Sequence, residues 1–99
     1  MSQLVFVVVR RRGSAWQEGT PLEGQMEWDA HARFMDELTE EGFIVLGGPL
    51  ETRSEALLIV RAQSESEIEQ RLAADPWYKL DLLRPSWMAP WIVRLGALE

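Results

Sequence analysis

The apolar residues of the chain fall into short runs separated by polar segments and by turns rich in glycine and proline. Residues 4–9 and residues 56–60 are continuous apolar runs with many β-branched side chains, a pattern typical of strands that are covered on both faces. Residues 43–46 form a further apolar run that ends at Gly47-Gly48-Pro49. These three segments are therefore predicted to be strands.

Two segments between the strands predict helices. Residues 27–41 place their large apolar side chains at i, i+3, i+4 and i+7, on one stripe, and Gly42 follows as a common C-terminal cap. The stripe consists of His31, Phe34, Met35 and Leu38. The polar face of the same helix consists of Asp29, Arg33, Asp36, Glu37 and Glu40. Ser64 and Glu67 form a capping-box pattern that predicts the start of a second helix, which ends before Pro76.

Two loops and a last strand complete the predicted elements. Residues 10–25 form a loop that is long for so small a chain, and long loops often carry function. Residues 76–85 predict a second loop, and residues 87–95 a last strand. Because Pro90 cannot donate a hydrogen bond, this strand is expected at a sheet edge or with a bulge.

The resulting order βαββαβ predicts an α+β, ferredoxin-like fold, with a four-stranded antiparallel sheet and two helices on one face. The strands at residues 4–9 and 56–60 would then lie in the middle of the sheet. They lack polar residues at alternate positions, although the helices cover only one face. A second copy of the chain is the simplest cover for the other face, which predicts a homodimer; a few exposed valines are the alternative.

Composition narrows the classes of function. Ninety-nine residues predict a single domain spanning residues 1–99. The net charge of −6 argues against nucleic acid as a partner, because phosphate binding needs a basic surface. Without cysteine there are no disulfides and no thiolate chemistry, and no apolar run reaches the roughly 18 residues of a membrane span. The start of the chain lacks the features of a signal peptide, so we expect a cytoplasmic protein with no membrane partner.

The chemistry that the sequence suggests centres on His31, the single histidine, and Asp75. The predicted topology brings the start of the first helix and the end of the second to the same rim of the sheet. A carboxylate that accepts from one imidazole nitrogen fixes the tautomer and makes the other nitrogen a better base. A buried histidine with a purely structural role is the alternative. One histidine and no cysteine leave too few ligands for a metal, and no other cofactor is predicted.

Further residues are candidates for binding a small molecule. Trp77 and Trp87 are expected either to stack on a flat ligand or to pack a loop against the sheet. Gly48 and Pro49 would let a ligand approach the backbone, although a turn that ends a strand explains them equally well. Arg10 would orient an anionic substrate at the rim, or else be solvated.

Four motifs together resemble the YciI-like (YCII-related) family, and the resemblance covers most of the chain. They are His-Ala-Arg-Phe-Met-Asp-Glu-Leu from residue 31, Glu-Gly-Phe-Ile-Val-Leu-Gly-Gly-Pro from residue 41, Ala-Asp-Pro-Trp from residue 74 and Ala-Pro-Trp from residue 89. The resemblance implies a dimeric α+β barrel in which His31 and Asp75 form the active-site pair. One relative in that family is a dehydrochlorinase that acts on a chlorinated hydroxyquinol, and similar barrels include muconolactone isomerases. The loop at residues 10–25 and the tryptophan-rich rim depart from the family pattern, so no substrate is carried over.

These observations lead to a small acid–base enzyme as the first hypothesis, a cofactor-independent isomerase or a lyase of the dehydrochlorinase type acting on a small organic substrate. The second hypothesis is a non-catalytic dimeric module that binds a small molecule or supports an assembly. A cofactor-independent monooxygenase is the third, and oxygen consumption would distinguish it from the first.

Overall fold

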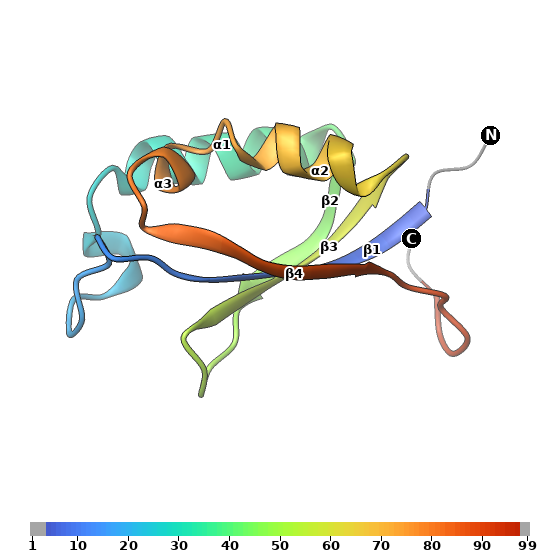
Figure 1. Cartoon of the computed structure of the whole chain (residues 1–99), viewed down its shortest axis with the longest axis horizontal. Helices are drawn as coiled ribbons and strands as arrows, with labels where there is room; N and C mark the ends of the chain where they lie inside the picture. The colour runs from blue at the N-terminus through green and yellow to red at the C-terminus, as the bar shows by residue number, and fades with distance from the viewer. Residues whose placement is uncertain (1–3, 98–99) are drawn as a thin grey trace.

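The computed structural model describes residues 4–97, and within them four strands form one antiparallel sheet (Figure 1). The strands are β1 (Leu4–Arg12), β2 (Ile44–Pro49), β3 (Glu55–Ala62) and β4 (Leu83–Pro90). Their order across the sheet is β2-β3-β1-β4, and each neighbouring pair is antiparallel. The two most apolar strands, β1 and β3, therefore lie in the centre, as the sequence predicts.

The helices lie over one face of this sheet (Figure 1). They are α1 (Trp28–Glu40), α2 (Glu65–Leu72) and the short α3 (Pro76–Lys79), and a 3-10 turn, η1 (Leu22–Gly24), precedes α1. This confirms the α+β class and is compatible with the predicted ferredoxin-like arrangement. In the part of the chain that the structure describes, no helix is both long enough and apolar enough to cross a membrane.

The short helix α3 corrects the prediction of a loop at residues 76–85. Asp75 caps this helix, because its carboxylate accepts a hydrogen bond from the backbone N–H of Trp77 at 2.9 Å. Pro76 takes the first helical position, where a missing N–H costs nothing. α2 ends at Leu72, before the Asp-Pro pair, and the pair starts the next helix.

The strand boundaries also differ from the prediction. β4 begins at Leu83 and ends at Pro90, earlier than the predicted strand at residues 87–95, because Leu83 already pairs with Arg12 at the end of β1. Pro90 lies in an edge strand, as predicted, since β4 has only β1 as a neighbour. Residues 47–49 continue β2 instead of closing it, with Gly47 opposite Leu58 of β3.

The main core lies between the sheet and the helices α1 and α2. Phe6 and Val8 of β1, Val60 of β3, Leu38 of α1 and Ile68 of α2 are each at most 4% exposed. Burial of side chains of this size stabilises the fold by about 1.5–3 kcal/mol each. The apolar stripe predicted for the first helix is therefore the face that packs on the sheet.

The opposite face of the sheet carries no helix (Figure 1). Val9 and Ile59 of the central strands nevertheless are only 5% and 6% exposed. The large exposed side chains lie on the outer strands, where Leu46 is 59% exposed opposite Ile59, and Trp87 is 53% exposed opposite Val9. The apolar surface left open therefore includes the exposed Leu46 and Trp87 together with the half-buried Val5 and Val7 of β1.

Candidate functional site

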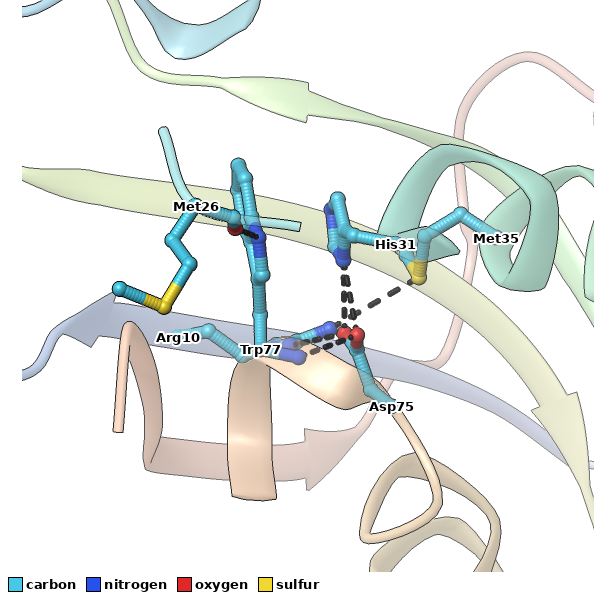
Figure 2. A network of polar contacts seen from close by, with 6 residues as sticks. All are labelled: Arg10, Met26, His31, Met35, Asp75 and Trp77. Carbon is cyan, nitrogen blue, oxygen red and sulfur yellow. Dashed lines mark hydrogen bonds and ion pairs between the residues drawn. The ribbon is translucent and has the colours of Figure 1, made fainter. Parts of the chain in front are cut away.

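Asp75 is the centre of a buried polar network that joins three elements, β1, α1 and α3 (Figure 2). Its side chain is fully buried between α2 and α3. Nδ1 of His31 lies 2.8 Å from one carboxylate oxygen and 3.0 Å from the other. The guanidinium of Arg10, from β1, donates to the second oxygen at 2.6 Å, and the N–H of Trp77 donates to the first. The carboxylate therefore accepts from three groups that are far apart in the sequence.

These contacts set the charge of Asp75. Burial raises the pKa of the carboxyl group, but the hydrogen bond from His31 and the charge and hydrogen bond of Arg10 outweigh it, and the pKa lies below its ordinary value of 3.8. Asp75 is therefore a carboxylate at neutral pH, and an ionised carboxylate can only accept hydrogen bonds. It follows that Nδ1 of His31 carries the proton in the neutral imidazole, which leaves the lone pair on Nε2.

The imidazole of His31 is also held by aromatic rings. The ring of Trp77 stacks on it with 3.8 Å between centroids and 4° between planes. Trp28, one helical turn earlier on α1, lies 6.0 Å away with its ring tilted. Trp77 is fixed in turn, because its indole N–H donates to the carbonyl of Met26 at 2.6 Å. The ring of His31 therefore has one orientation, with Nδ1 toward Asp75 (Figure 2).

A pocket of about 390 Å³ opens beside His31, between α1, the first loop and β2. Its wall is mostly apolar, and Nε2 of His31 has no hydrogen-bond partner among the residues that the structure describes. The residues that line this pocket include Arg10, Trp28, His31, Met35, Asp36 and Leu58. The one imidazole nitrogen that is left without a protein partner thus belongs to a side chain that lines a cavity.

The predicted site residues have different positions. The structure brings His31 and Asp75 together, and Gly48 and Pro49 line the same pocket from β2. Arg10 corrects the expectation of a solvated side chain: it is 4% exposed and paired with Asp75, and it is one of the residues that line the pocket. This follows from the alternation of β1, which turns Phe6, Val8 and Arg10 toward the helices.

The two tryptophans proposed to stack on a ligand lie in different parts of the structure. Trp77 is 1% exposed and packs on His31 and on Trp16, so its ring is part of the support for the site and is not a platform for a ligand. Trp87 does not line the pocket and lies opposite Val9, on the sheet face away from the helices. In a single copy of the chain Trp87 therefore lies away from the His31 pocket, and its expected role in binding a ligand stays a prediction.

Several side chains that shape this site were not predicted from the sequence as site residues, although Met35 was placed on the same stripe as His31. Trp28 and Met35 lie three positions before and four positions after His31, so helical spacing places them on the same face of α1. Leu22, in the first loop, closes the pocket from the other side. Helical periodicity was a sufficient signal for the first two, whereas no local pattern points to Leu22.

Metal binding finds no support in the described range. No group of three His, Asp or Glu side chains within residues 4–97 is arranged to hold a metal ion. Arg10 also occupies one oxygen of Asp75, and His31 lies against both. The pocket therefore offers an imidazole and an apolar wall, which suits proton transfer to or from an organic molecule.

Comparison of the chain with protein-family models, with curated proteins and with solved structures finds no match. The resemblance to the YciI-like family consequently depends on the sequence motifs alone and stays a prediction.

Proposed function

We propose that the protein is a small acid–base enzyme in which Nε2 of His31 takes a proton from an organic substrate bound in the adjacent pocket. The observation that carries this proposal is the hydrogen bond between Nδ1 of His31 and the buried Asp75 carboxylate at 2.8 Å. Asp75 orients the ring, holds the proton on Nδ1 and stabilises the imidazolium that forms when Nε2 accepts a second proton.

Two reaction classes use this arrangement without a change of oxidation state. In an isomerisation, Nε2 removes a proton from one carbon and the imidazolium returns it to another. In an elimination, Nε2 removes the proton, the electron pair of that C–H bond forms the double bond, and the leaving group departs with its own electron pair. The imidazolium then passes the proton to water. We therefore infer an isomerase or a lyase, in agreement with the family resemblance of the motifs.

The first test is the tautomer of His31, followed by long-range ¹H–¹⁵N NMR of the imidazole. With a single histidine in the chain, the signals need no assignment. The native protein should show the proton on Nδ1 in the neutral ring. In Asp75→Asn the amide can donate to Nδ1, and the proton should move to Nε2. Asp29→Asn is the control, because Asp29 is exposed and lies two positions before His31 on the same helix.

A tautomer that is the same in the native protein and in Asp75→Asn would contradict the proposed role of Asp75.

The second test is catalytic and uses a substrate identified by screening small ketones, lactones and halogenated phenols. His31→Ala should lower kcat by about 10²–10⁴-fold, the contribution of a positioned base. Turnover that is unchanged in His31→Ala would rule out the enzyme hypothesis for that substrate.

A non-catalytic binding module is the second candidate, and one observation favours it. Arg10, Asp75, His31 and Trp77 satisfy one another in the interior, so the network can stabilise the fold without performing chemistry. This function predicts a ligand that copurifies or binds in the pocket and is recovered unreacted. Mass spectrometry of the ligand after incubation with the protein separates the two candidates.

We also propose that two copies of the chain pack their open sheet faces together and form a dimeric α+β barrel. Leu46 and Trp87 support this, because large apolar side chains that are more than half exposed have a cost in water that a second sheet would remove. Light scattering coupled to size-exclusion chromatography tests it directly. A molar mass near twice the 11.4 kDa of one chain is expected at micromolar concentration.

A further inference from the structure

The charges around the pocket restrict the kind of molecule that it can hold. Arg10 is the cationic side chain that lines it, and this guanidinium is already bound to Asp75 at 2.6 Å. Asp36, exposed on α1, lines the pocket with a carboxylate that has no ion pair among the described residues. With His31 neutral, the charges of Arg10, Asp75 and Asp36 sum to about −1.

The hydrogen-bonding groups of the site also disfavour an anionic ligand. Within residues 4–97, no buried side-chain nitrogen or oxygen lacks a partner, so no buried donor waits for an anion. The hydroxyl of Thr39, which also lines the pocket, donates to the carbonyl of Met35 at 2.9 Å. Nε2 of His31 is free for a ligand, and in the neutral ring its lone pair accepts a hydrogen bond and repels a carboxylate.

The remaining wall of the pocket is apolar. Leu22, Trp28, Met35, Leu58 and Leu83 all line it. Contact with these side chains favours an apolar ligand. A carboxylate would lose hydration without gaining a counter-charge, and a cation would gain only a solvent-screened contact with the exposed Asp36.

We propose that the pocket takes an uncharged, mainly apolar substrate and rejects carboxylates. The inference deepens the proposed function and rests on it only in treating the ligand as a substrate. It separates this chain from an enzyme whose substrate is an organic acid, since such an enzyme needs a cation that is free to meet the acid. Arg10 is not free, because Asp75 holds it.

The test compares three probes of nearly equal size: benzyl alcohol, benzoate and benzylamine. Each is titrated into the native protein at about pH 8, above the ordinary pKa of histidine of about 6.5. The readouts are the carbon-bound proton resonances of the His31 ring and the indole N–H resonance of Trp28. Benzyl alcohol should bind with a Kd at least about fivefold lower than that of either ion.

Variants assign the selectivity to the pocket. Asp36→Asn removes the unpaired carboxylate and should narrow the difference between benzyl alcohol and benzoate. Glu40→Gln removes the same charge from the same helix outside the pocket and should leave the difference unchanged. Benzoate or benzylamine binding as tightly as benzyl alcohol would overturn the inference. An absence of saturable shifts with all three probes would overturn it too.

The outcome is distinguishable from failure of the proposed function. If His31 is not a base, the tautomer or the turnover tests fail while the order of the three probes stays the same. If the pocket prefers carboxylates, the probe order changes while the Asp75-dependent tautomer is kept.

Discussion

At the scale of single residues, the site depends on one carboxylate with several functions. Asp75 caps α3 through the Trp77 N–H, neutralises the buried Arg10 and fixes the His31 ring. The helix cap needs only an oxygen that accepts a hydrogen bond, whereas the buried Arg10 needs a negative charge. Asparagine keeps an oxygen for the helix cap but removes the charge, so it leaves Arg10 buried without a counterion. The acidity of Asp75 therefore links the candidate chemistry to the stability of the fold.

That link predicts an acid-dependent loss of stability. The pKa of Asp75 is lowered in the folded state, so its contribution is complete above about pH 4, the unfolded value, and is lost as the pH falls through the folded value. At pH 7, Asp75→Asn should lower the free energy of unfolding by about 3–5 kcal/mol, the usual cost of breaking a buried ion pair. Below about pH 4 the native protein should approach the variant.

Urea unfolding of both proteins between about pH 7 and pH 3, at one protein concentration, measures this difference. The difference between the two curves isolates Asp75 from other carboxylates such as Asp81, whose pKa is also lowered, mainly by its hydrogen bond with Arg84. Curves that stay parallel over the whole range would show that the charge of Asp75 does not stabilise the fold.

At the scale of elements, the first loop between β1 and α1 forms one wall of the pocket. Gln25, which is 3% exposed, holds this loop: its side-chain oxygen accepts from the Gln17 N–H, and its amide donates to the carbonyls of Gln17 and Thr20. The loop carries Leu22 into the pocket and Trp16 against Trp77. Gln25 thus holds the second half of this loop, while Asp81 accepts hydrogen bonds from the Ser14 N–H and hydroxyl at its start.

Replacing Gln25 should loosen this wall. Gln25→Leu removes three hydrogen bonds worth about 1 kcal/mol each, so we expect a loss of about 2–3 kcal/mol in the free energy of unfolding. Amide hydrogen exchange should become faster between residues 14 and 25. Gln70→Leu is the control, because Gln70 is exposed and makes a single long contact with Ser66. Equal exchange in the two variants would mean that other contacts hold the loop.

The elements also show why prediction from sequence succeeded in some places and failed in others. The order of the elements and the capping box were predictable because each depends on a local pattern, and Ser64 does accept from the Glu67 N–H. The strand order then followed from the rule of right-handed crossovers. The helix α3 was missed because four residues carry no periodic signal.

The site residues show the same contrast. The contact between His31 and Asp75 followed from topology alone, since both lie at helix ends on one rim. The position of Arg10 was not predicted, because it depends on how far β1 continues beyond its apolar run. Trp87 lies on the other face of the sheet because it pairs with Val9, whereas the next residue, Met88, pairs with Val8 and packs against the core.

At the scale of the whole molecule, the helices and the open sheet face divide the chain into two functional sides. The His31 pocket lies on the helical side, so the chemistry and the proposed dimer contact do not compete for the same surface. Trp87, excluded from the pocket, becomes the side chain best placed to test the contact. It is 53% exposed and lies beside the nearly buried Val9, at the edge of the apolar face.

Introducing a charge at this position should separate the copies without unfolding them. Trp87→Glu removes an aromatic side chain from the proposed contact and places a carboxylate against apolar surface, so the dimer Kd should rise by about 100-fold or more. The monomer should keep its stability, because the side chain is already exposed to solvent.

Tyr78→Glu is the matched control: it changes an exposed aromatic residue on α3, on the helical side of the sheet. Light scattering over a dilution series should therefore give monomers for Trp87→Glu at concentrations where the native protein and Tyr78→Glu are dimers. A native protein that is monomeric throughout, or a Trp87→Glu variant that dimerises like the native protein, would show that the sheet face is not the contact.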